Sequence, residues 1–327
     1  YATTGLLAGG AIVLLIAVWS WLPSQEEVAS RVAQQFHERT GVQIDFSHVR
    51  CSFWPQPTLV VENAVTRQTS PIVLSRLRLQ ASWASVLRRS PQLQDIELDG
   101  AVVPQVSLHE LSAGGDARHG PGPGAGWLPG DVRLRLRELT WVDRRGIELD
   151  YEGAVELDAD GLPRQARIAR AGSSPPTQLR LEREGQAWRW RVLIDVPGGS
   201  WNGSAQLERT GERLRLTAEL EPRGVDVEAL LGAFHRRSVV AGRANGKTTV
   251  SAEADTPAGL PASLRTSRSF VMNPARLTRL DLAKPVRSAG AAESGQTALD
   301  ELSGIVETRG TGNGVEFRYR DLSARSG

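Results

Sequence analysis

The chain has 327 residues, of which 40% are hydrophobic and 23% are charged, and its formal net charge is +2. This composition excludes a chain that is disordered throughout. Arginines alternate with apolar residues instead of forming basic blocks, so no nucleic-acid partner is expected. The single cysteine, Cys51, excludes an intramolecular disulfide and a cysteine-based metal site.

Residues 5–22 form an uncharged apolar run. As a helix this run would be roughly 27 Å long, close to the ~30 Å hydrocarbon core of a bilayer. The alternatives are a cleaved signal peptide and a buried core helix, but the sequence after the run suits signal cleavage badly. We therefore expect residues 1–23 to be an uncleaved transmembrane anchor, with tryptophan side chains at the membrane–water interface. Its membrane-contacting residues are Leu6, Leu7, Ile12, Leu14, Leu15, Trp19 and Trp21.

An amphipathic helix is expected directly after the anchor. Ser24 and Glu27 have the spacing of a capping box at a helix start, and Gly41 is a typical stop. Between them one apolar stripe recurs every four residues: Val28, Val32 and Phe36. The polar face of this helix is not notably basic. We therefore expect the helix to cover the end of a β structure instead of lying on a membrane.

From residue 42 onward the apolar period changes to two, which is typical of half-buried strands. The alternation recurs over residues 42–46, 132–136, 188–196 and 214–220. Turn residues separate the later runs, so we expect an antiparallel meander over residues 127–255. Short helices are expected only at 82–89 and 225–234. Residues 112–126 are rich in Gly and Pro and indicate a loop or linker.

The motifs of catalysis and cofactor binding are weak or absent in this sequence. Residues 241–248 read AGRANGKT, similar to a phosphate-binding loop, but a strand-like run follows where such a loop needs a helix. We therefore expect Lys247 to lie in a turn. The histidines have no paired ligand spacing, and no G-x-S-x-G nucleophile motif occurs. We predict no enzyme activity, no catalytic residue, no cofactor and no metal.

The alternating apolar face is the remaining feature, and it has two interpretations. In the first, two such faces bury each other in a closed sandwich or barrel. In the second, an open, curved sheet presents its apolar face to acyl chains. Period-two alternation alone does not separate them.

Motifs at both ends of the chain resemble the bacterial AsmA family, whereas residues 114–223 resemble it poorly. The N-terminal motifs are Thr40-Gly41-Val42, Phe53-Trp54-Pro55-Gln56-Pro57, Glu62-Asn63-Ala64, Leu77-Arg78-Leu79, Ser82-Trp83-Ala84-Ser85-Val86-Leu87 and Ile96-Glu97-Leu98-Asp99-Gly100. The C-terminal motifs are Ala275-Arg276-Leu277, Leu280-Asp281-Leu282, Thr297-Ala298-Leu299-Asp300-Glu301-Leu302-Ser303-Gly304 and Asp321-Leu322-Ser323-Ala324-Arg325-Ser326-Gly327. Family members normally continue with further strands, so we expect this chain to be a fragment that is truncated at its C-terminus.

The resemblance implies a single-pass protein of the bacterial inner membrane with its soluble region in the periplasm. The implied fold is mostly β: the anchor and amphipathic helix precede an elongated antiparallel sheet curled into a groove, with few short helices. The implied regions are the anchor at 1–23, an N-terminal AsmA-like region at 24–111, the linker at 112–126, the meander at 127–255 and an incomplete C-terminal region at 256–327.

The resemblance also implies a role in cell-envelope and outer-membrane biogenesis. Our first hypothesis is that the groove binds or transfers phospholipid or another acyl-chain ligand, with headgroups left in water and little headgroup specificity. The candidate lining residues are Trp188, Trp190, Val192, Ile194, Leu214 and Leu216. The alternative is a non-enzymatic scaffold that assists outer-membrane protein assembly or targeting through protein partners.

Overall fold

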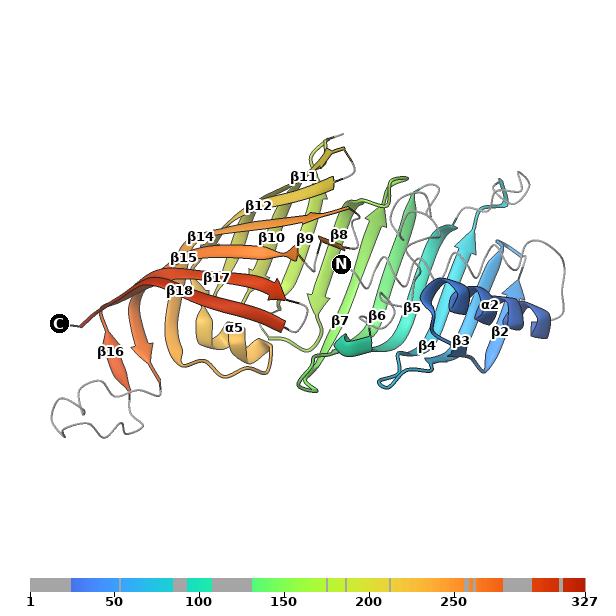
Figure 1. Ribbon diagram of the computed structural model, residues 1–327, viewed down its shortest axis with the longest axis horizontal. Helices are drawn as coiled ribbons and strands as arrows, with labels where there is room; N and C mark the ends of the chain where they lie inside the picture. Colours follow the sequence, from blue (N-terminus) through green and yellow to red (C-terminus); the bar gives the residue numbers. More distant parts are fainter. Residues whose placement is uncertain are drawn as a thin grey trace. The chain divides into compact units, whose positions relative to one another are not determined.

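The computed structural model describes residues 25–52, 54–84, 93–107, 131–174, 176–185, 187–211, 213–255, 259–260, 263–278, 296–311 and 314–326. Strands dominate these residues, and the helices are few and short (Figure 1). The expected mostly β fold is therefore confirmed. The chain divides into two compact units: unit 1, with described residues 25–171, and unit 2, with described residues from 172 onward.

Eight strands and the helix α2 make up most of the described part of unit 1. They are α2 (Gln25–Thr40), β1 (Ile44–Asp45), β2 (His48–Ser52), β3 (Thr58–Thr66), β4 (Val73–Ala81), β5 (Leu93–Pro104), β6 (Val132–Val142), β7 (Glu148–Leu157) and β8 (Pro163–Arg170). From β2 to β8 each strand pairs with the next one in the sequence, and β1 pairs with β3. Strands of this unit therefore pair in sequence order, and β6, β7 and β8, which lie in the predicted meander at 127–255, are antiparallel neighbours joined by short turns as expected.

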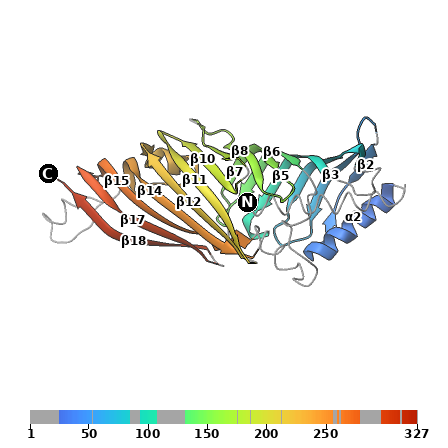
Figure 2. The ribbon, with the colours of Figure 1, turned by 90° about the horizontal axis from the view of Figure 1, so that it is seen from above.

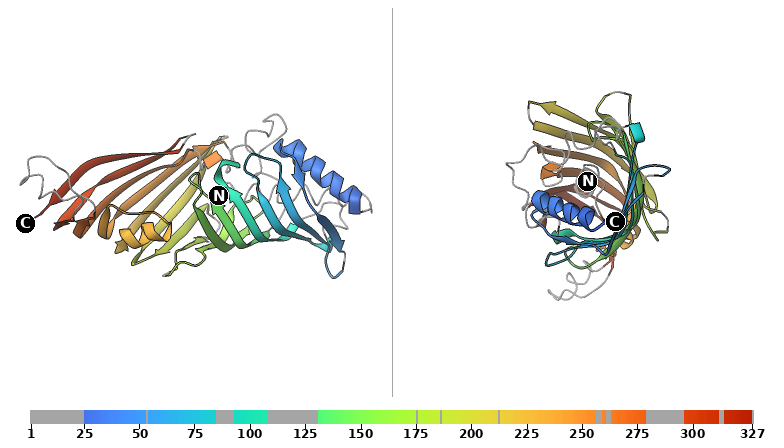
Figure 3. Two further views of the ribbon diagram at one scale, coloured as in Figure 1. Left: turned by 90° about the horizontal axis from the view of Figure 1, so that it is seen from below. Right: turned by 90° about the vertical axis from the view of Figure 1, so that its right-hand side faces the viewer.

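The helix expected after the anchor is α2, which packs on the first strands of unit 1 (Figure 2 and Figure 3). Val32 from the apolar stripe is only 1% exposed, and Phe36 is half-buried. The helix ends at Thr40 because Gly41 adopts a φ of 70°, in the left-handed region, and donates its backbone N–H to the His37 carbonyl at 2.8 Å. The helix covers β1 and β2, as predicted from its weakly basic polar face.

One pairing in unit 1 corrects the prediction of an antiparallel sheet, because β5 and β6 run parallel. A parallel pair needs a crossover connection of about a dozen residues or more, and residues 105–131 provide that length. The sheet of unit 1 is therefore mixed. The Gly/Pro-rich residues 112–126 and most of the helix expected at 82–89 lie outside the described residues.

The two faces of the unit 1 sheet differ in polarity. Apolar side chains fill one face, and the most deeply buried include Leu79, Ile96, Leu98 and Leu134. The other face carries a ladder of cross-strand ion pairs. In this ladder Asp95, Glu97 and Asp99 of β5 lie opposite Arg133, Arg135 and Arg137 of β6, respectively.

Ten strands and the α-helix α5 make up most of the described part of unit 2. They are β9 (Gln178–Arg183), β10 (Arg189–Val196), β11 (Gly199–Thr210), β12 (Arg213–Arg223), β13 (Val225–Asp226), α5 (Val227–Ala233), β14 (Val240–Ala254), β15 (Arg265–Leu277), β16 (Thr297–Leu299), β17 (Glu301–Thr311) and β18 (Gly314–Arg325). Every pairing is antiparallel, and the strand order is β9, β10, β11, β12, β14, β15, β17, β18. The short strands β13 and β16 pair with β14 and β15.

The helix expected at 225–234 is α5, which begins two residues later than predicted. Asp226 caps it by accepting a hydrogen bond from the Ala229 backbone N–H at 2.9 Å. The two residues before the helix form β13 instead, because Val225 pairs with Ala244 of β14 and is almost fully buried.

The expected anchor at residues 1–23, with its seven membrane-contacting side chains, lies outside the described residues. Among the residues that are described, none belongs to a helix with the length and apolar character needed to span a membrane.

Candidate functional site

The sheet of unit 2 has one apolar face, which we call the apolar face of unit 2. Cross-strand register identifies its members, because residues that lie opposite each other in a ladder point to the same side of the sheet. One row across the strands reads Leu181, Val192, Gly203, Leu220, Thr248, Arg268, Val306 and Tyr319. Leu181, Val192, Leu220 and Val306 are apolar, and Tyr319 is aromatic with a hydroxyl. Gly203 has no side chain, and Thr248 and Arg268 are the polar members of the row.

The structure brings the candidate lining residues of the sequence prediction together on this face. Trp190, Val192 and Ile194 alternate along β10, and Leu214 and Leu216 occupy positions of the same phase on β12. Trp188 lies just before β10 and accepts a backbone hydrogen bond from Leu207. Trp190, Val192 and Leu214 are buried, whereas the other three are half-buried. Their shared face is established, and their role as lining residues stays a prediction.

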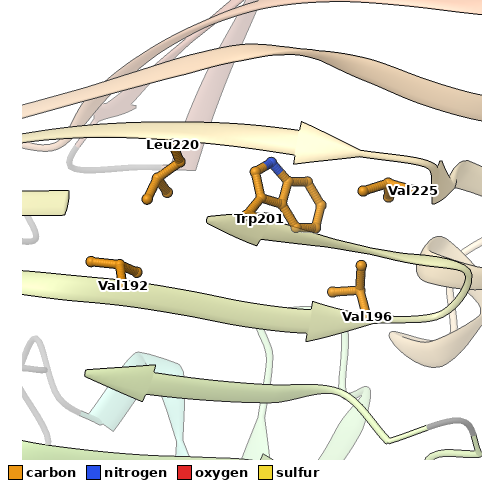
Figure 4. Packing of buried hydrophobic residues seen from close by; sticks show 5 residues of the cluster. All are labelled: Val192, Val196, Trp201, Leu220 and Val225. Atoms are coloured by element: carbon orange, nitrogen blue, oxygen red, sulfur yellow. The ribbon is translucent and has the colours of Figure 1, made fainter. Parts of the chain in front are cut away.

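A cluster around Trp201 belongs to the same face but was missed by sequence reasoning. Trp201 packs with Val192, Val196, Leu220 and Val225, and Figure 4 shows these side chains gathered beside the indole. Leu230 of α5 and Leu179 of β9 pack against the cluster. Trp201 escaped detection because the next positions of the same face on β11 are Gly203 and Ala205, which weaken the apolar alternation.

The opposite face of unit 2 is charged and ion-paired. Arg180 pairs with Asp195 between β9 and β10, and Arg215 pairs with Glu253 at 2.8 Å between β12 and β14. Lys247 bonds Glu219 at 2.9 Å from the middle of β14. The predicted turn position of Lys247 was therefore wrong. Residues 241–248 form a strand, and no helix N-terminus follows them to receive a phosphate.

Within the described part of unit 2, α5 is the one α-helix, and it packs against β13 and β14. Over the other strands, no described helix or second sheet layer of this unit lies on the apolar face. On β18, Phe317 is 58% exposed and Tyr319 is 59% exposed. Large aromatic side chains on the apolar face are thus open to solvent at that strand.

Three arginines lie over tryptophan rings of this face. The guanidinium carbon is 5.3 Å from the ring centroid for Arg183 and Trp190, 5.8 Å for Arg209 and Trp188, and 5.6 Å for Arg268 and Trp201. These distances are those of cation–π contacts. Desolvation by surrounding protein atoms lowers the pKa of Arg268, although part of its side chain remains open to solvent. An arginine nevertheless keeps its charge at neutral pH.

The described residues contain no cluster of three or more His, Cys, Asp or Glu side chains arranged to hold a metal ion. Among the histidines, His48 contacts the Ser47 hydroxyl at 3.2 Å on an exposed surface.

Comparison with known proteins gives no relative. No family of proteins matches this chain, and no curated protein or solved structure matches it either. The resemblance to the AsmA family therefore rests on the short motifs alone and stays a prediction.

Proposed function

We propose that this chain is a membrane-anchored periplasmic protein of the bacterial inner membrane that binds phospholipid acyl chains on the apolar face of unit 2. One observation carries the proposal: a sheet with one apolar and one ion-paired face, whose apolar face has no described covering layer in its unit except α5. On β18, Phe317 and Tyr319 of this face are exposed, whereas Trp190 and Val192 on β10 are buried. Exposed large apolar side chains of this kind mark interaction surfaces.

The contact between Arg268 and Trp201 spans two intervening strands, and a concave apolar face would favour it. These residues belong to β15 and β11, and β14 and β12 lie between them. In a flat sheet β11 and β15 would be about 14 Å apart at ~4.8 Å per strand. A guanidinium 5.6 Å from the indole centroid requires the two side chains to converge above the intervening strands.

Acyl chains are long, so each chain can bury many methylene groups on the apolar face. Removing apolar surface from water yields about 25 cal/mol per Å², or about 0.8 kcal/mol for each buried methylene. A face several strands wide contacts many methylenes at once, so no specific polar contact is needed for weak binding. Cell-envelope and outer-membrane biogenesis is the role we assign, supported by the predicted anchor and the AsmA resemblance of the motifs.

Native mass spectrometry of the full chain, extracted in mild detergent, tests the proposal. We expect co-purifying phospholipid at a defined ratio to the protein. Ile194→Asp places a charge on the apolar face and is expected to remove the lipid. Leu193→Asp is the matched control, because Leu193 is the next residue of β10, is also half-buried and lies on the other face.

Lipid bound equally by both variants, each folded by circular dichroism, would contradict the proposal. A lipid-free wild-type chain that instead co-purifies with a stoichiometric envelope protein would favour the scaffold function. The two functions are thus separated by one measurement on one preparation.

A further inference from the structure

Arg268 is in an unusual position for a charged residue. It lies on the apolar face of unit 2, opposite Thr248 of β14 and Val306 of β17, with Phe270 two residues further along β15. Among the described residues of β14, β15 and β17, no other charged side chain lies on this face. The other described positions of this face on β14, β15 and β17 are therefore all apolar or uncharged.

The charge of Arg268 has no counter-ion among the described residues. On the opposite face, Arg215 has a carboxylate partner at 2.8 Å, whereas Arg268 contacts the Trp201 ring and forms no ion pair with any described side chain. Protein atoms around the guanidinium desolvate it and lower its pKa. The residue as a whole is exposed, so an anion can reach the guanidinium and form a charge-assisted hydrogen bond with it.

Thr248 supplies a second, independent indication of a ligand. Its side chain is 3% exposed, and its hydroxyl has no hydrogen-bond partner among the described residues. Buried hydroxyls are normally hydrogen-bonded, so an unpaired one calls for an explanation. Thr248 lies in the cross-strand row between Leu220 and Arg268, so Thr248 and Arg268 occupy directly opposite positions of β14 and β15 on the same face.

We infer that Arg268 and Thr248 receive the phosphate of an anionic phospholipid whose acyl chains lie along the cluster of Trp201, Leu220 and Val192. This inference rests on the proposed function and deepens it, because it assigns a position to the headgroup. Charge complementarity selects the occupant: an arginine fork matches phosphate oxygens, and the apolar cluster matches the chains. The sequence-based expectation of little headgroup specificity is thereby replaced by a preference for negative charge.

Competitive lipid loading of the full chain in mild detergent tests the inference. The probes are phosphatidylglycerol, phosphatidylcholine and diacylglycerol with identical acyl chains, and native mass spectrometry reports the bound ratio. We expect the wild-type chain to prefer phosphatidylglycerol to diacylglycerol by about tenfold, the size of one charge-assisted contact. Arg268→Met keeps much of the side-chain length but not the charge, and it is expected to remove the preference while diacylglycerol binding persists.

Arg265→Met is the matched control, because Arg265 is three residues earlier on β15 and lies on the opposite face. It is expected to keep the preference. A salt titration of the wild-type chain gives a readout that does not depend on any variant folding: raising the salt from about 0.05 M to about 0.5 M should weaken the preference by screening.

The results distinguish failure of the headgroup site from failure of the proposed function. An unchanged phosphatidylglycerol preference in Arg268→Met, or a wild-type preference that is absent or insensitive to salt, overturns the headgroup site while leaving acyl-chain binding in place. Failure of the wild-type chain to bind any of the three lipids overturns the proposed function together with this inference.

Discussion

At the scale of single residues, two glycines of unit 2 have opposite surroundings. Gly203 is on β11, where an added Cβ would approach the Glu219 carbonyl oxygen of β12 to 1.9 Å. Gly232 is in α5, where an added Cβ would meet nothing within 4 Å and no left-handed φ is involved. The first glycine permits the close pairing of two strands, whereas the second only adds freedom to the unfolded chain.

We therefore predict opposite effects of the same substitution. Gly203→Ala should lower the free energy of unfolding by about 1–3 kcal/mol, because β11 and β12 must separate or distort. Gly232→Ala should leave it unchanged or raise it by about 0.5–1 kcal/mol. Urea unfolding followed by tryptophan fluorescence measures both. A Gly203→Ala chain as stable as the wild type would show that the pairing of these strands is described incorrectly.

At the scale of elements, the ion-pair ladder of unit 1 holds the parallel strands β5 and β6. Glu97 is its centre, because its carboxylate is 2.7 Å from Arg135 of β6 and 3.6 Å from Arg78 of β4. Its side chain is only 20% exposed, so solvent screens these contacts less than it would on an open surface. The ladder thereby joins three neighbouring strands.

Charge reversal at Glu97 tests the ladder. Glu97→Lys places three positive charges together and should lower the free energy of unfolding by about 1 kcal/mol or more, which Arg135→Glu in the same chain should partly restore. Glu152→Lys is the control, since Glu152 on β7 forms no ion pair with a described residue. Additive effects of the Glu97 and Arg135 substitutions in thermal or urea unfolding would show that the ladder contributes nothing.

The same ladder explains why the direction of β6 was not predictable from the sequence. Acidic residues at 95, 97 and 99 face arginines at 133, 135 and 137, and this spacing of two gives matched charges whether the strands run parallel or antiparallel. Alternation predicted that strands exist and which side chains share a face, as it did for Trp190, Val192 and Ile194. Strand direction depends on the connection, which period-two alternation does not encode.

The candidate site was predictable to a similar extent. The apolar faces of β10 and β12 were identified because large apolar side chains alternate along both strands. Trp201 was not identified, because the small residues that share its face on β11 weaken the alternation. Arg268 did leave a signal, because it is in phase with Phe270 and Met272 on β15 and not with Ser267 and Ser269. Its contact with Trp201 could be found only from the structure. The sequence pattern of one strand does not show which side chains meet across four strands.

At the scale of the whole molecule, the proposed function requires the chain to stay at a membrane. The apolar run at residues 5–22 is the segment that we assign to that role. In the proposed function, phospholipid binding by unit 2 and membrane attachment by the run are separate properties. Loss of the anchor should therefore release the protein without removing its capacity to bind lipid in detergent.

Replacement of Leu14 and Leu15 together by arginine tests the anchor while keeping the length of the run. Each charge at the centre of a spanning helix costs about 2.5–3.5 kcal/mol on insertion scales, which should prevent stable insertion. The wild-type chain is expected in the membrane pellet after alkaline carbonate washing and to be cleaved by protease added to spheroplasts. The double variant is expected in the supernatant, whereas Ala2→Arg, outside the run, should stay in the pellet. A double variant that remains in the washed pellet, or a wild-type chain protected in intact spheroplasts, would overturn the single-pass periplasmic arrangement.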